Sequence, residues 1–225
     1  MCYGNNDFDQ TLILLNRCGW DTDCNCGNVG SIMGALKGLE GIDEKWILPI
    51  RDILNASSAI GFLNIQTVSD TAILFAKLAY RLQGMEVDYD PFELPYAYKG
   101  FRCDKGKIGI KDHCLCIDAP EIYKTLYYLK EDLYDARYDP QFSPVIYPGD
   151  TLEINLYSDH KQEIILLIYT CDDQIYHSEI KTIQGKVRIL YQIPSHTNMC
   201  INRIAVKAQR AYQIQSYRVI RHPAI

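Results

Sequence analysis

The N-terminal part of the chain spaces its apolar residues at the period of an α-helix. Apolar side chains recur every three or four positions over residues 8–18, and Gly19 follows them. This pattern predicts a short helix that ends at the glycine. Thr67 and Asp70 have the spacing of a capping box, and an apolar face extends from there to Leu82. This second pattern predicts another helix with a defined start.

Residues 23–37 predict a further helix, which carries a stripe of small side chains. The stripe consists of Gly27, Gly30, Ser31, Gly34 and Gly38. Each glycine costs a helix about 1 kcal/mol relative to alanine, so several of them indicate a close approach by neighbouring backbones. We therefore expect this helix to be buried in a bundle, and residues 1–98 to form a helical domain.

The apolar period changes to that of strands beyond residues 91–100, which are rich in Pro, Tyr and Gly. β-type runs occupy residues 151–157, 163–170, 186–193 and 201–207. Turn signals separate them at Pro148-Gly149-Asp150, Ser158-Asp159-His160 and Gln184-Gly185. The expected fold class is α+β in two domains, with an antiparallel β-sandwich over residues 99–225 after the helical domain.

The composition narrows the range of partners. Hydrophobic residues make up 48% and charged residues 23% of the 225 residues, as in ordinary soluble globular proteins. A net charge of -5 gives no reason to expect nucleic acid as a partner, and no apolar run approaches the roughly 20 residues that cross a membrane. The start of the chain lacks signal-peptide features, and its nine cysteines show no disulfide-scaffold spacing, so we expect reduced thiols in the cytoplasm.

Two carboxylates stand two residues apart where a loop enters the glycine-rich helix. They are Asp21 and Asp23, within the stretch Gly-Trp-Asp-Thr-Asp-Cys that ends at Cys24. Hard cations such as Mg²⁺ and Mn²⁺ prefer carboxylate oxygen, so the pair is a candidate for part of a metal site. The alternative is that both aspartates only satisfy the free N–H groups and the dipole at the helix start.

The longer context favours the metal interpretation. From Gly19 to Gly38 the chain reads GWDTDCNCGNVGSIMGALKG, and Trp46 follows nearby. This stretch resembles the closing motif of the ADP-ribosylglycohydrolase family, and the similarity extends over residues 3–83. The resemblance implies an all-α catalytic domain around two Mg²⁺ or Mn²⁺ ions, with Asp21 and Asp23 as ligands. Cys24 stands where the family usually has a threonine or serine whose hydroxyl joins the metal shell, so either that ligand is absent or water replaces it.

The resemblance also implies a function. Family members hydrolyse the glycosidic bond between ADP-ribose and an acceptor, so the implied partner is an ADP-ribosylated substrate or a related nucleotide-sugar. The family's upstream Asp-Asp-Thr motif has no counterpart before Asp21, and Ser69-Asp70-Thr71 is interpreted as a helix start. We therefore expect a C-terminal fragment that is inactive alone, with a helical face that invites self-association or an upstream chain.

Residues 99–225 resemble the accessory sandwich of long bacterial members of this family. The most distinctive pieces are Arg137-Tyr138-Asp139-Pro140, Phe142-Ser143-Pro144 and Tyr147-Pro148-Gly149-Asp150. A jelly-roll-like sandwich of the carbohydrate-binding kind supports a second hypothesis, a non-catalytic binding or scaffolding module that recognises a glycan or a protein. A zinc site from Cys24-x-Cys26 and Cys114-x-Cys116 is disfavoured, because structural zinc sites space their cysteines more widely.

Overall fold

The computed structural model describes residues 3–56, 60–87, 96–129, 142–196 and 200–222. The chain divides into two compact units, Met1–Ile50 and Arg51–Ile225. The helix α4 belongs to the second unit, together with the strands. The expected domain boundary near residue 98 stays a prediction, and the motif at residues 137–140 lies outside the described residues.

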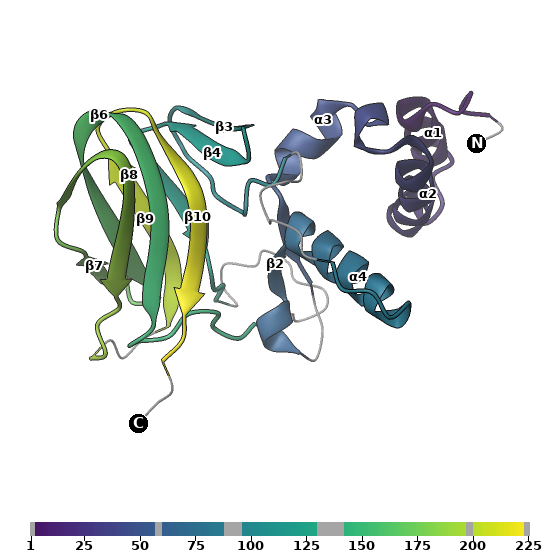
Figure 1. The fold of residues 1–225 in the computed structure, drawn as a ribbon. Helices are drawn as coiled ribbons and strands as arrows, with labels where there is room; N and C mark the ends of the chain where they lie inside the picture. Colours follow the sequence, from purple (N-terminus) through teal and green to yellow (C-terminus); the bar gives the residue numbers. More distant parts are fainter. Residues whose placement is uncertain (1–2, 57–59, 88–95, 130–141, 197–199, 223–225) are drawn as a thin grey trace. The chain divides into compact units, whose positions relative to one another are not determined.

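The N-terminal unit is helical (Figure 1). Its elements are α1 (Phe8–Arg17), α2 (Thr22–Lys37), the 3-10 turn η1 (Leu39–Gly41), α3 (Glu44–Ile47) and the 3-10 turn η2 (Leu48–Ile50). Asp7 caps α1, because its side chain accepts a hydrogen bond from the Gln10 N–H at 2.8 Å. The two helices predicted in this unit are confirmed, each within about one residue of its expected bounds.

The expected bundle around α2 is present only in part. α1 packs against α2, and a Cβ placed on Gly30 would lie 3.7 Å from Cδ2 of Leu12. Gly27 has no atom within 4 Å of such a position, and Met33 is the buried residue of the helix. Ile32 is 52% exposed and Leu36 is 54% exposed. The described residues therefore leave most of the small-residue stripe uncovered.

The C-terminal unit opens with a small hairpin and a helix, and a large sheet follows. The first elements are β1 (Ile53–Asn55), the 3-10 turn η3 (Gly61–Leu63), β2 (Ile65–Thr67) and α4 (Val68–Leu82). The strands of the sheet are β3 (Lys107–Lys111), β4 (Cys114–Asp118), β5 (Glu121–Thr125), β6 (Thr151–Thr170), β7 (Ile175–His177), β8 (Lys181–Gln192), β9 (Ile201–Ala208) and β10 (Tyr212–Ile220). The antiparallel β1–β2 pair was not expected in a helical region.

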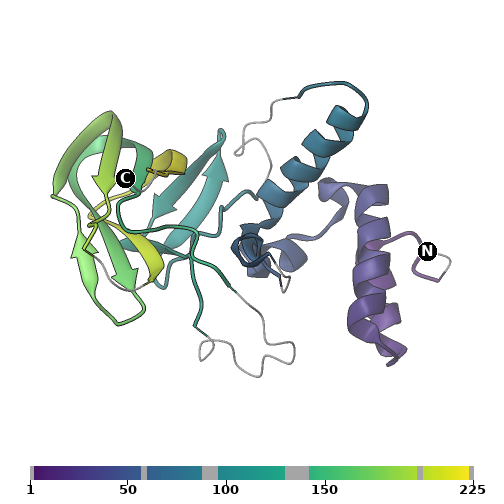
Figure 2. The ribbon, with the colours of Figure 1, turned by 90° about the horizontal axis from the view of Figure 1, so that it is seen from below.

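The large sheet is antiparallel and curls around the long strand β6 (Figure 2). In the described residues its strands run in the order β3-β4-β10-β6-β9-β5, with β7 and β8 also paired to β6. The first half of β6 pairs with β10 and the second half with β9, so one strand serves both parts of the curl. Leu152, Ile154, Leu166 and Ile168 of β6 are each fully buried. Each contributes about 1.5–3 kcal/mol through removal of apolar surface from water.

The turns predicted at Ser158-Asp159-His160 and at Gln184-Gly185 are wrong, because strands β6 and β8 run through them. Between the pairs Ser158↔Gly185 and Gln162↔Ile183, residues 159–161 of β6 face residue 184 of β8, so the extra residues form a bulge. The Ser158 hydroxyl donates to the His160 carbonyl at 2.8 Å and accepts from the Gln162 amide at 2.7 Å. These hydrogen bonds satisfy polar groups of the bulge. In β8, which faces the bulge, Gly185 adopts a left-handed backbone conformation with φ +69°.

Among the described residues, no helix is long and apolar enough to span a membrane. The helix predicted to begin near Thr67 and to run to Leu82 is confirmed as α4. Thr67 caps it, since the Thr67 hydroxyl accepts a hydrogen bond from the Asp70 N–H at 3.0 Å. The apolar face predicted for this helix is largely exposed, with Phe75 67% and Leu82 86% exposed.

Candidate functional site

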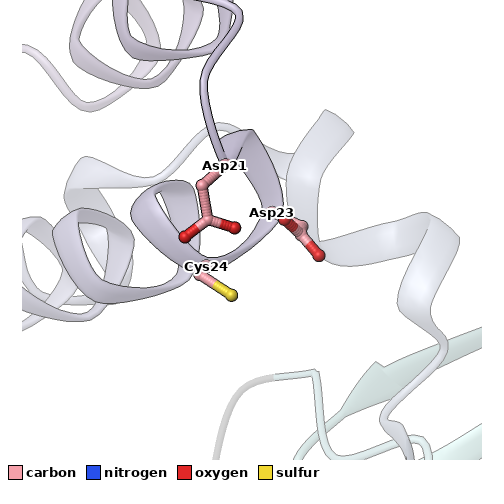
Figure 3. A group of neighbouring side chains, drawn as sticks. All are labelled: Asp21, Asp23 and Cys24. Atoms are coloured by element: carbon pink, nitrogen blue, oxygen red, sulfur yellow. The ribbon is translucent and has the colours of Figure 1, made fainter. Parts of the chain in front are cut away.

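The first turn of α2 brings together Asp21 and Asp23, the predicted metal ligands, and Cys24, which stands at the family's third ligand position. The carboxylate oxygens of Asp21 and Asp23 and the sulfur of Cys24 all lie within 4.8 Å of one another. All three side chains are exposed, and Figure 3 shows them together at the start of the helix. Within the described part of the chain, this is the one group of three or more His, Cys, Asp and Glu side chains at ligand spacing.

Backbone geometry at the start of α2 keeps the Asp21 side chain out of the usual capping role. Asp21 is the N-cap residue with φ 44°, in the left-handed region, and its side chain makes no capping hydrogen bond. Asn25 holds this turn, because its amide donates to the Trp20 carbonyl at 3.0 Å and its N–H donates to the Asp21 carbonyl at 3.0 Å. The capping alternative therefore does not describe Asp21, whereas Asp23 lies in the first turn, where helix dipoles favour acids.

Cys24 differs from its two neighbours in its donor chemistry. A hydrogen bond with the Asp21 carboxylate, together with the negative charges of Asp21 and Asp23, raises the pKa of the Cys24 thiol. Mg²⁺ and Mn²⁺ prefer oxygen ligands, and a thiol sulfur is a poor match for them. The two carboxylates therefore fit a divalent cation as part of a ligand set, and the sulfur does not.

A second acidic cluster lies at the start of α4 in the C-terminal unit. Asp52 is 7% exposed and accepts three hydrogen bonds: from the Ser69 N–H at 2.8 Å, the Ser69 hydroxyl at 2.7 Å and the Lys99 N–H at 2.8 Å. Lys99 Nζ pairs with Asp70 Oδ1 at 2.6 Å. We call Asp52, Ser69, Asp70 and Lys99 the α4 cluster.

Electrostatics in the α4 cluster are those of a partly buried network. Burial raises the pKa of Asp52, and the hydrogen bonds from Ser69 and Lys99 offset part of that effect. Burial also disfavours the charge of Asp70, but the hydrogen bonds from Lys99 and Thr67 outweigh it and lower the pKa of this carboxyl. Sequence reasoning assigned Asp70 to a helix start and missed Asp52 and Lys99, because residues 47 positions apart give no local signal.

Residues 1–78 match the model of the ADP-ribosylglycohydrolase family. The matched segment includes the whole N-terminal unit, with Asp21 and Asp23, and continues into α4. The family resemblance of this part of the chain is thereby confirmed, and the matching family is one of hydrolases. The match stops before the large sheet, which begins at β3.

Other comparisons add little to this assignment. No curated protein matches the chain. Among solved structures, a variant of a family 29 carbohydrate-binding module has a TM-score of 0.39 and 10% sequence identity, and covers 54% of this chain and 75% of its own. An agarase has a TM-score of 0.37 and 12% identity, and covers 61% of this chain and 24% of its own. TM-scores below 0.5 do not define the fold of the C-terminal unit.

Proposed function

We propose that residues 1–78 are the C-terminal portion of an ADP-ribosylglycohydrolase catalytic domain, which hydrolyses the glycosidic bond between ADP-ribose and an acceptor. The observation that carries the proposal is the family match over residues 1–78. The same segment groups two exposed carboxylates, Asp21 and Asp23, at the start of a helix. Exposed carboxylates with free lone pairs are what a hard cation needs, and a helix start fixes their relative positions.

Asp21 and Asp23 are the proposed ligands for a divalent cation in this domain. When bound, Mg²⁺ or Mn²⁺ supplies polarisation of ribose hydroxyls and of water for attack at the anomeric carbon. The left-handed backbone of Asp21 aims its carboxylate toward the side chains of the first turn of α2 (Figure 3). Cys24 contributes no oxygen, so solvent occupies the position that a threonine or serine hydroxyl has in the family.

The remaining ligands of a complete site come from further helices in this proposal. Two carboxylates fill only part of the near-octahedral oxygen shell that Mg²⁺ requires. The uncovered faces support this idea: Ile32 and Leu36 of α2 are about half exposed, and Phe75 and Leu82 of α4 are more than half exposed. Apolar faces of this kind are typical of helices that pack against neighbours. We propose that an upstream helical segment, or a second chain, covers them.

Metal binding by this chain alone is the first test. Calorimetric titration with Mg²⁺ and with Mn²⁺ should show no micromolar affinity, because solvent supplies most of the shell. A turnover assay on ADP-ribosylated arginine and serine peptides should give no product. Micromolar affinity or measurable turnover would contradict the proposal that the site is incomplete.

Paramagnetic broadening locates weak binding, which calorimetry misses. Millimolar Mn²⁺ should broaden the amide signals near Asp21 and Cys24 before those of other exposed acids. Asp23→Asn should remove this selectivity. Asp118→Asn is the matched control, because Asp118 is also exposed but lies at the end of β4, outside any cluster of possible ligands in the described residues. Equal broadening around Asp118 and Asp23 would argue against a metal site.

The second candidate function is a non-catalytic binding or scaffolding role, in which a jelly-roll-like C-terminal unit recognises a glycan or a protein partner. The favouring observation is that this unit has its own buried core and a cavity of about 320 Å³. The two candidates separate on one variant. Asp23→Ala removes hydrolysis in a completed enzyme, and it leaves binding by the C-terminal unit unchanged.

A further inference from the structure

A cavity of about 320 Å³ lies in the C-terminal unit, between the β1–β2 hairpin and the strands β5 and β10. Its lining mixes apolar and polar side chains. The polar and aromatic members used below are Asn55, Gln66, Asp70, Lys124, Tyr128 and Tyr217. The volume is at the lower end of the range for small-molecule sites in proteins.

Lys124 is the unpaired cation of this cavity. Among the described residues its Nζ has no hydrogen-bond or ion-pair partner, and it lies 5.3 Å from the ring centroid of Tyr217. Lys124 is partly buried on β5, and its Cε would lie 3.6 Å from a Cβ on Gly100. A lysine held between an aromatic ring and a backbone has lost part of its hydration without gaining a counter-ion.

The nearest acids do not neutralise Lys124 directly. Asp70 lines the same cavity, but its Oδ1 accepts from Lys99 Nζ at 2.6 Å and its Oδ2 accepts from the Thr67 hydroxyl at 2.6 Å. Asp52 is buried and committed to Ser69 and to the Lys99 N–H. Lys99 is a second cation beside these acids. The two carboxylates and one ammonium of the α4 cluster carry a formal net charge of -1, but both carboxylates direct their hydrogen bonds to Thr67, Ser69 and Lys99. The Lys124 ammonium therefore has no direct partner among the described residues.

The other lining groups suit a small polar ligand. Gln66 is fixed, because its amide donates to the Leu63 carbonyl at 2.8 Å and its carbonyl accepts from the Thr71 hydroxyl at 3.0 Å. Asn55 adds a further amide, and the ring of Tyr128 contributes an aromatic surface. Amides and aromatic rings around one charged group are a common composition of ligand sites.

We propose that this cavity binds a small sugar-like ligand through a carboxylate or phosphate group, with the Lys124 ammonium as the contact for that oxyanion. An oxyanion supplies the direct ion-pair partner that the described residues do not give Lys124, and charge-assisted hydrogen bonds of this kind are about twice as strong as neutral ones. The site is independent of Asp21 and Asp23, which lie in the other unit.

The protonation state of Lys124 sets the pH range in which the oxyanion binds. Burial lowers the pKa of Lys124 to about 8, while Asp70 and Asp52 raise it and Lys99 lowers it further. The ammonium is therefore mostly charged at pH 7 and mostly neutral at pH 9. Oxyanion binding should weaken about tenfold over this interval.

The test uses the whole chain and four probes observed by NMR: ribose 5-phosphate and glucuronate as anions, ribose and glucose as neutral matches. We expect at least one anion to bind at least tenfold more tightly than its neutral match, with shifts at Gly100, Thr125 and Tyr217. Phosphate-only or carboxylate-only binding identifies which oxyanion the site takes. Equal binding of an anion and its neutral match, or no shift at these residues with any probe, overturns the proposal.

Lys124→Met is the decisive variant, and Lys207→Met is its matched control. Lys207 pairs with Glu121 at 3.1 Å and does not line this cavity. Lys124→Met should weaken anion binding at least tenfold and should unfold at a higher temperature than the wild type, because the folded state disfavours the charge that it removes. Lys207→Met should bind like the wild type. Unchanged anion affinity in a folded Lys124→Met protein overturns the proposal. If the variant does not fold, the comparison of anions with their neutral matches and the pH dependence still test the proposal in the wild type.

Discussion

The start of α2 and the start of α4 both carry aspartates, and the two places use them differently. At α4, Asp52 is 7% exposed and accepts three hydrogen bonds from Ser69 and Lys99. At α2, Asp21 is exposed and makes no capping hydrogen bond, although it occupies the N-cap position. Asp52 is saturated by its own protein, whereas the Asp21 carboxylate bonds only to the Cys24 thiol among the described residues and keeps its remaining lone pairs for solvent or for a ligand.

Burial accounts for this difference. A carboxylate taken out of water must recover its hydrogen bonds from the protein, so a buried acid is a structural group unless it is left unpaired. An exposed acid has no such requirement, because water solvates it. Grouped acids that are exposed and unused by the backbone are therefore better candidates for metal ligands than grouped acids that are buried and satisfied. The cluster at α2 is of the first kind, and Asp52 of the α4 cluster is of the second.

The largest expected effect separates the two clusters by activity. In a protein completed by the helices that supply the remaining ligands, Asp23→Ala should lower the rate of hydrolysis about a thousandfold. The physical reason is loss of a metal contact that contributes about 4 kcal/mol to the transition state. A turnover assay at saturating Mg²⁺ measures it. Asp118→Ala should leave the rate unchanged, and near-normal turnover by Asp23→Ala would remove Asp23 from the proposed role.

The second effect is on stability and belongs to the α4 cluster. Asp52→Ala should lower the free energy of unfolding of the C-terminal unit by about 3 kcal/mol, because it leaves the donors of Ser69 and Lys99 buried without an acceptor. The melting temperature should fall by roughly 10 °C. Urea unfolding followed by circular dichroism measures the free energy, and Asp118→Ala should stay within about 0.5 kcal/mol of the wild type. A loss as small as that of the control would show that Asp52 is dispensable.

Sequence patterns predicted the helices of this protein better than its clusters of charged side chains. Periodicity placed the helices that became α1, α2 and α4, because their apolar spacing is local. The turn signal at Ser158-Asp159-His160 misled, since polar residues that open a turn also satisfy a bulge. The α2 acids were found because they lie two positions apart along the chain, whereas Asp52 and Lys99 are joined only by the fold.

The ion pair of the α4 cluster gives a smaller effect with a defined pH dependence. Lys99→Met should cost about 1 kcal/mol at pH 7, because Lys99 is buried and Asp70 is half exposed. The pKa of Asp70 is lowered in the folded state, so its pairing stabilises the protein above the unfolded-state pKa near 4 and is lost as pH falls through the folded value. The stability difference between wild type and Lys99→Met should be constant above about pH 5 and shrink below pH 4. A difference that grows in acid would contradict this assignment.

The smallest effect returns to the cluster at α2. Asp23→Ala should change the stability of the N-terminal unit by no more than about 0.5 kcal/mol, because Asp23 is exposed and accepts no hydrogen bond given by another described side chain. Trp20 and Trp46 both lie in this unit, so tryptophan fluorescence during urea unfolding reports on it selectively. The matched control is Asp9→Ala in the same unit, since Asp9 bonds to both Lys45 and Trp46 and its loss should lower the unfolding midpoint visibly. If Asp23→Ala destabilised the unit as much as Asp9→Ala does, Asp23 would be a structural acid like Asp52, and the contrast between the two helix starts would fail.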